Sequence, residues 1–346
     1  MVAGGCPKEM RFGPCGGVRD DETCEVDARP CPFFGPSSAP APGLRQAIVD
    51  PVRVLGIPGT WPTPVTIVDV RVPSTWSGDE RRLWHRIASG LGGCVALIGE
   101  HVDNSRRDDD AGPVDAAVAV EILASHEVPA IVTITGRDRD LEAARGQMVR
   151  LAAAGATAVH CVTGDHPAAL GIDRSAWFGA EAVTLARLAA DLGLVATVGE
   201  SPASPGRRAE RVAIKAAAGA TACVLNHAGD VAELVAFADE CRQLGTAIAM
   251  VAPIPMVGDL DALAGLAQFP GLRVPDRFVE IMAGSSDHVQ TAVDTAALMA
   301  AELVASGRFV GVNLSGGAAG TDPVVRIETT RRFIDAIHAE YDGQRP

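Results

Sequence analysis

The chain has 346 residues, of which 47% are hydrophobic and 21% are charged. This composition suits one large globular domain with a small addition, or two domains. The net charge of −13 disfavours nucleic acid as a partner, because phosphate binding needs a concentrated basic face. The apolar runs are shorter than the roughly 20 residues that a membrane-spanning helix needs, so we expect no membrane partner.

The first residues of the chain contain a cluster of cysteines. MVAGGCPKEM lacks the basic segment and apolar run of a signal peptide, so we expect a cytoplasmic protein with reduced thiols. Four of the eight cysteines, namely Cys6, Cys15, Cys24 and Cys31, fall in the first 31 residues. In a reducing compartment such a cluster indicates a metal site, with zinc favoured over an iron–sulfur cluster, although four unrelated thiols are the alternative. The glycines around Cys15 leave room for backbone N–H groups to approach its sulfur.

A segment rich in Pro, Ser and Ala, residues 32–42, follows the cysteines and is typical of an extended linker. We therefore place a cysteine-rich metal-binding module and its linker in residues 1–45. The remaining residues, 46–346, form the second and larger unit.

Short β-branched runs alternate with helical stretches along this larger unit. They predict eight strands, at residues 65–70, 94–99, 130–134, 158–162, 195–199, 222–226, 247–253 and 309–314. Eight such strands over about 290 residues match a (β/α)8 TIM barrel in number and length. An open doubly wound sheet is the alternative, and it is weakened because no G-x-G-x-x-G follows an early strand.

An internal repeat supports the barrel. MVRLAAAGATAVHCVTGD at 148–165 and RVAIKAAAGATACVLNHAGD at 211–230 share a helix, a turn, a strand and a Gly-Asp. In a barrel, the residues at the carboxyl ends of the strands face the active site. We therefore expect seven polar side chains to meet there: Asp69, Glu100, Thr135, Asp165, Glu200, Asn226 and Asn313.

Lysine is rare in this chain, because Lys8 and Lys215 are the only two among 30 basic residues. Lys offers a compact point charge where Arg offers a planar fork. These two positions are therefore candidates for a specific role.

The sequence resembles the methylenetetrahydrofolate reductase family over nearly its whole length. CPKEMRFGPCGGVRDDETCEVDARPCPFF is similar to a cysteine-rich module associated with these reductases, and the two repeat segments are similar to the family's strand ending in Gly-Asp-x-Pro and its Lys-x-x-AGA strand. The segment MVAPIPMVGDLDALAGLAQFPGLRVP also follows the family pattern. The resemblance implies a folate substrate, a flavin (FAD or FMN) and NAD(P)H as co-substrate.

The resemblance also implies roles for particular residues. Asp69 takes the place of the acid that protonates folate N10, and Asp165 lies beside the flavin and pterin rings. Asn226 contacts the pterin, and Lys215 binds a flavin phosphate. The remaining cofactor site is expected at Gly164, Thr163, Thr135 and Glu200.

Several flavin contacts of the family are replaced here; for example, Thr163 stands where the family has Arg. Two alternatives to a flavoenzyme therefore stay open. One is direct hydride transfer from NAD(P)H, and the other is a flavin-free folate-binding or complex-forming subunit. Glu100 is the alternative to Asp69 as the proton donor. We also expect a homo-oligomer, with a possible protein partner at the cysteine module.

Overall fold

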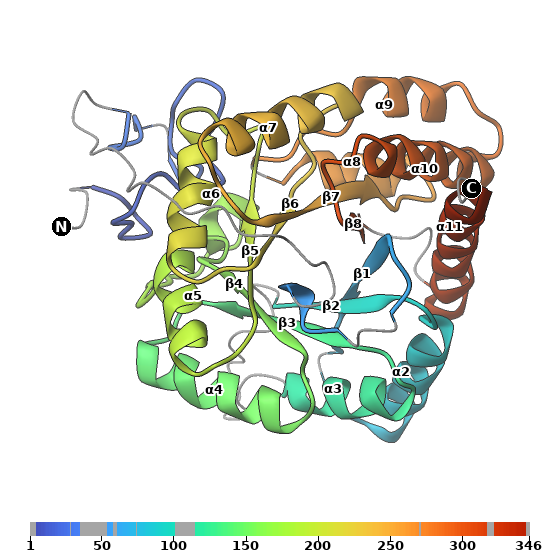
Figure 1. Cartoon of the computed structure of the whole chain (residues 1–346), viewed down its shortest axis with the longest axis horizontal. Helices are drawn as coiled ribbons and strands as arrows, with labels where there is room; N and C mark the ends of the chain where they lie inside the picture. The colour runs from blue at the N-terminus through green and yellow to red at the C-terminus, as the bar shows by residue number, and fades with distance from the viewer. Residues whose placement is uncertain are drawn as a thin grey trace.

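The computed structural model describes residues 5–27, 29–34, 54–57, 61–73, 75–100, 115–269, 271–316 and 322–343. Within these ranges, eight parallel strands form a closed barrel in which consecutive strands pair and β8 pairs with β1 (Figure 1). The strands are β1 (Val65–Arg71), β2 (Val95–Gly99), β3 (Ala130–Thr135), β4 (Ala158–Val162), β5 (Ala196–Glu200), β6 (Ala222–Leu225), β7 (Ala249–Pro255) and β8 (Gly311–Ser315). The predicted (β/α)8 barrel is therefore confirmed. Five strands, β1, β3, β5, β7 and β8, end one or two residues later than the sequence predicts.

Helices surround the barrel and alternate with its strands (Figure 1). They are α2 (Gly78–Gly90), α3 (Ala116–Ser125), α4 (Leu141–Ala153), α5 (Ala182–Asp191), α6 (Arg208–Ala217), α7 (Val231–Gln243), α8 (Leu260–Ala267), α9 (Asp276–Ala283), α10 (His288–Ala305) and α11 (Pro323–Gly343), with a short 3₁₀ helix η2 (Pro167–Leu170). Side-chain caps fix where several begin, since Ser77, Asp140 and Asp259 each accept a hydrogen bond from a backbone N–H in the first turn. In the described part of the chain, no helix is long and apolar enough to cross a membrane.

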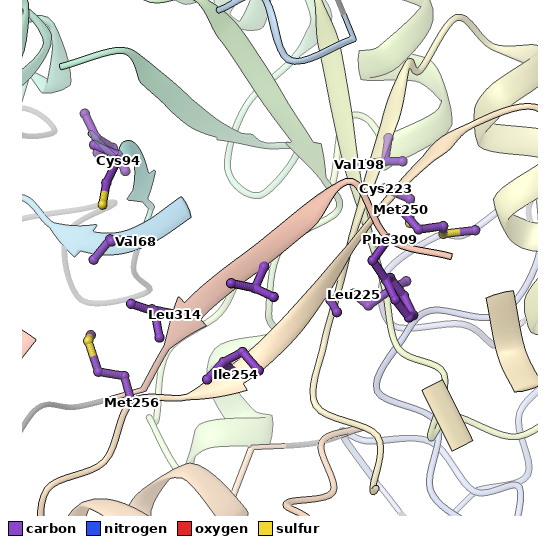
Figure 2. Close-up of a cluster of buried hydrophobic side chains, with 14 of the residues drawn as sticks. Val68, Cys94, Val198, Cys223, Leu225, Met250, Ile254, Met256, Phe309 and Leu314 are labelled. Carbon is purple, nitrogen blue, oxygen red and sulfur yellow. The ribbon is translucent and has the colours of Figure 1, made fainter. Parts of the chain in front are cut away.

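The larger hydrophobic core lies between the strands and the surrounding helices. Figure 2 shows part of it, with the side chains of Val68, Cys223, Met250 and Leu314 from four strands and with Phe309 near Met250. Cys94, Cys161, Cys223 and Cys241, the cysteines outside the N-terminal cluster, are all buried in this core. They act as small hydrophobic side chains there.

A second core fills the interior of the barrel. Val65 and Ile67 of β1 belong to it, whereas Val68 belongs to the outer core. Because side chains alternate along a strand, Asp69 points into the barrel on the same face as Ile67. Leu55 and Ile57 also pack in this second core, so residues 54–57 belong to the barrel. Most of the predicted linker lies outside the described residues.

The closure between β8 and β1 gives a test of the fold. A Cβ atom added at Gly311 would lie 2.0 Å from the carbonyl oxygen of Val65, whereas one added at Gly265 in α8 would meet nothing within 4 Å. We expect Gly311→Ala to lower the free energy of unfolding by about 1–3 kcal/mol or more, the usual cost of overpacking. Gly265→Ala is the control and should change it by less than about 1 kcal/mol. Urea unfolding measures both, and equal stability of the two variants would contradict this closure.

Candidate functional site at the barrel mouth

A cavity of about 760 Å³ opens at the carboxyl ends of the strands. Its volume lies within the range typical of small-molecule sites. All seven polar residues that the sequence predicts at this end line it: Asp69, Glu100, Thr135, Asp165, Glu200, Asn226 and Asn313. Parallel strands all end at the same face of a barrel, which explains why residues so distant in sequence meet here.

Asp69 has a largely desolvated carboxyl group at this mouth. The side chain of Asn313 on the neighbouring strand β8 hydrogen-bonds to it, while Oδ1 of Asp69 is buried without a partner among the described residues. Burial raises the pKa of Asp69 to about 7, against the smaller opposing effect of the Asn313 hydrogen bond. Asp69 can therefore carry a proton near neutral pH.

Glu100 has a different environment, although it lies on the adjacent strand end. Arg139 donates to both of its oxygens, at 3.0 and 3.2 Å, and the hydroxyl of Thr135 donates to Oε1 at 2.8 Å. The pair with Arg139 is largely buried. Glu100 is therefore held as an ionic anchor. The sequence analysis did not single out Arg139, which lies in the loop after β3.

The turn after β4 carries Thr163, Gly164 and Asp165. Gly164 has φ +94°, and a Cβ there would lie 3.0 Å from that of Thr135, so the turn requires glycine. Arg137 is buried and donates to the backbone carbonyl of Asp165 at 3.0 Å. This hydrogen bond stabilises the turn. The side chain of Asp165 is left exposed on the cavity wall.

Glu200 and Lys215 form part of a buried ionic cluster. Arg211 and Lys215 of α6 donate to Glu200 at 2.7 and 2.9 Å, and Lys215 also donates to the backbone carbonyl of Gly199 at 2.6 Å. Burial alone would raise the pKa of Glu200, but the two cations lower it to about 2. Lys215 is thus the counter-ion of Glu200, a partner that the sequence analysis did not predict for it.

Polar side chains at the carboxyl ends of β6 and β8 also line the cavity. Asn226 donates to the hydroxyl of Ser201 at 2.7 Å, and Nε2 of His227 lies 2.8 Å from the hydroxyl of Ser315. Burial lowers the pKa of His227 to about 4, so this imidazole is neutral at working pH. These groups present hydrogen-bonding atoms without charge.

The N-terminal segment covers one side of the mouth. It supplies Lys8, Met10, Phe12, Cys15 and Glu25 to the cavity lining. Figure 1 shows this segment, in blue, beside α6.

Hydrogen bonds fix the segment to the barrel. The backbone N–H of Arg11 donates to Glu181 at 3.0 Å, and the hydroxyl of Ser204 donates to the carbonyl oxygen of Gly16 at 2.6 Å. The cysteine segment is therefore part of the site wall. The sequence analysis instead treats it as a separate module.

The four N-terminal cysteines lie in one neighbourhood. Cys6 interacts electrostatically with Cys15 and Cys31, and Cys24 interacts with Cys31. Backbone N–H groups of Gly17 and Phe33 approach the sulfurs of Cys15 and Cys31, which is a feature of metal–thiolate sites. Across the described ranges, however, no three His, Cys, Asp or Glu side chains are grouped so that they could hold a metal ion.

A closed (β/α)8 barrel with polar side chains gathered at the carboxyl ends of its strands has the architecture of a barrel enzyme. Residues 109–315, more than half of the chain, match the family model described as methylenetetrahydrofolate reductase. The chain therefore belongs to the methylenetetrahydrofolate reductase family. The cysteine segment lies outside the matched residues.

Comparisons with curated proteins and with solved structures give less information about the family. No curated protein matches this sequence. A solved structure titled "Native KDPGal structure" is similar, with a TM-score of 0.44 and 13% identity over 80% of this chain and 96% of that one.

The metal site stays a prediction, with Cys6, Cys15, Cys24 and Cys31 as the ligands and zinc favoured over iron. We expect about one metal ion per chain by elemental analysis of the purified protein. Cys24→Ser with Cys31→Ser should lose the metal, whereas Cys94→Ser is the control and should retain it, since Cys94 is buried in the barrel core. A protein that contains neither zinc nor iron, with four titratable N-terminal thiols, would contradict the prediction.

Proposed function

We propose that this protein reduces the methylene bridge of 5,10-methylenetetrahydrofolate to a methyl group, with NAD(P)H as the source of hydride. The observation that carries the proposal is Asp69, a buried carboxyl group with a pKa of about 7 at the mouth of a barrel of this family. A general acid works best when its pKa lies near the working pH.

The reaction needs one proton and one hydride. The proton passes from the Asp69 carboxyl to N10 of the folate, and the bond between N10 and the methylene carbon breaks. The lone pair of N5 forms an iminium with that carbon. Hydride from C4 of the dihydronicotinamide then adds to the carbon and gives the 5-methyl product and the oxidised nicotinamide. Asp69 regains its proton from water.

Other residues of the mouth orient the substrate in this proposal. The exposed Asp165 carboxylate accepts hydrogen bonds from the pterin, and Asn226 contacts the same ring from β6. Glu100 lines the same cavity, and Arg139 fixes its carboxylate in place there.

The residues present fit a flavin phosphate poorly at the position that the resemblance indicates. Two of the three N–H donors of Lys215 are engaged by Glu200 and Gly199, and the nearby Arg211 is paired with the same carboxylate. Segment 8–17 also lines this side of the cavity. We therefore propose that the hydride passes directly from the nicotinamide to the folate.

The proton donor gives the first test of this function. Asp69→Asn keeps the shape of the side chain but cannot deliver a proton, so we expect kcat to fall by about 10²–10⁴-fold. In the wild type, kcat should fall as the pH rises above about 7, because the donor is then deprotonated; this limb should vanish in Asp69→Asn. If Glu100→Gln removes that limb and Asp69→Asn leaves it, the donor is Glu100.

The route of the hydride gives the second test. The two C4-deuterated forms of NAD(P)H are supplied in turn to protein prepared without added flavin, and the methyl product is analysed by mass spectrometry. We expect one of them to transfer its deuterium to the methyl group. A reduced flavin would exchange its N–H with water, so loss of the label together with a flavin spectrum would contradict direct transfer. Folate binding without any turnover would indicate the binding-subunit alternative.

A further inference from the structure

The N-terminal segment places a buried ion pair in the wall of the cavity. Lys8 is 6% exposed and Glu25 is 3% exposed, and the two side chains form a salt bridge. Burying two charges is costly unless both find good partners. Both residues also line the cavity, so a ligand bound there can reach this pair.

The ammonium group of Lys8 lies near the turn that carries Asp165. It interacts electrostatically with Asp165 and lies 5.9 Å from the ring centre of Phe178, which stacks with His166 of the same turn. The buried carboxylate of Glu25 is the counter-charge of this ammonium group. An ammonium group has three donors, and one salt bridge leaves others for a ligand.

We propose that Lys8 and Asp165 together recognise the 2-amino-4-oxo edge of the pterin, with Lys8 donating a hydrogen bond to the 4-oxo oxygen. This inference rests on the proposed folate function. That edge presents two donors, the 2-amino group and N3–H, followed by one acceptor, the 4-oxo group. A carboxylate beside an ammonium group offers the complementary order of two acceptors and one donor.

The inference gives the cysteine segment a role in substrate choice. Lys8 lies two residues after Cys6, in a turn where the N–H of Glu9 donates to the carbonyl of Cys6 at 3.1 Å. Its partner Glu25 follows Cys24 directly. The backbone around these cysteines thus sets the position of the pair. A site that pairs with a polar group of its substrate discriminates strongly against an analogue in which that group is changed.

The test compares folic acid with its 4-amino-4-deoxy analogue, which presents an amino donor toward Lys8 and lacks the proton at N3. Isothermal titration calorimetry of the full chain at pH 7.5 gives Kd for each compound. We expect the wild type to bind folic acid about tenfold to a hundredfold more tightly than the analogue, as for a hydrogen bond to a charged group. Lys8→Met with Glu25→Gln should lower this ratio about tenfold, because it removes the donor to the 4-oxo group and leaves no unpaired charge. Any preference that remains comes from N3, which faces Asp165 in this proposal.

Two further variants test the assignment of Lys8 as the donor to the 4-oxo group. Arg29→Met removes an exposed cation of the same segment, paired with Asp27, and should retain the preference for folic acid. Lys8→Gln, whose amide can donate or accept, should also lower the ratio of the two affinities and serves if the double variant does not fold. A ratio that is unchanged by the loss of Lys8 overturns its assignment alone. If neither compound binds the wild type, the proposed folate function fails and this inference fails with it.

Discussion

The buried carboxylate of Glu200 holds together the side of the barrel on which the site is built. It ends β5 and receives both Arg211 and Lys215 from α6, so that strand and helix are joined beneath the cavity. Removing one partner from such a buried cluster typically costs about 3–5 kcal/mol, because an uncompensated charge remains. Arg211 also interacts with Cys15 and Cys31 and donates to the carbonyl of Gly206, and it thereby connects the cluster to the cysteine segment. The same cluster engages the only lysine of the barrel unit, which is the physical argument against a flavin phosphate there.

Two carboxyl groups on adjacent strands acquire opposite properties from their surroundings. No cation pairs with Asp69 in the part of the chain that the structure describes, so burial dominates and its proton is retained up to about pH 7. Glu100 accepts hydrogen bonds from a guanidinium group, a hydroxyl and a backbone N–H, so its charge is balanced within the protein. Two carboxyl groups at neighbouring strand ends thus have different environments, one desolvated and the other ion-paired.

Much of this architecture could be predicted from sequence because it follows from local patterns. The apolar runs and the AAAGATA repeat predict the strands and their order, and the strand ends predict which polar side chains meet. The partners of these side chains could not be predicted in the same way. Arg139 reaches Glu100 from a loop, and Lys215 pairs with a residue on another element. These contacts depend on loop geometry and on the packing of α6, which no residue spacing encodes. The docking of the cysteine segment on the mouth was missed for the same reason, since it rests on single hydrogen bonds between distant residues such as Arg11 and Glu181.

The position of the cysteine segment explains why a small unit can matter to a large barrel. A segment of about 30 residues buries too little apolar surface to fold alone, so it needs either a metal or the barrel to order it. Here it contacts the barrel through Glu181 and Ser204, at loops that follow β4 and β5. Those loops lie at the mouth of a (β/α)8 barrel, where the active site is found. An interaction that orders the cysteine segment therefore also affects the shape of the cavity. The proposed metal and the proposed substrate would therefore both act on Lys8 and Glu25, which lie close to Cys6 and Cys24 in the sequence and line the cavity.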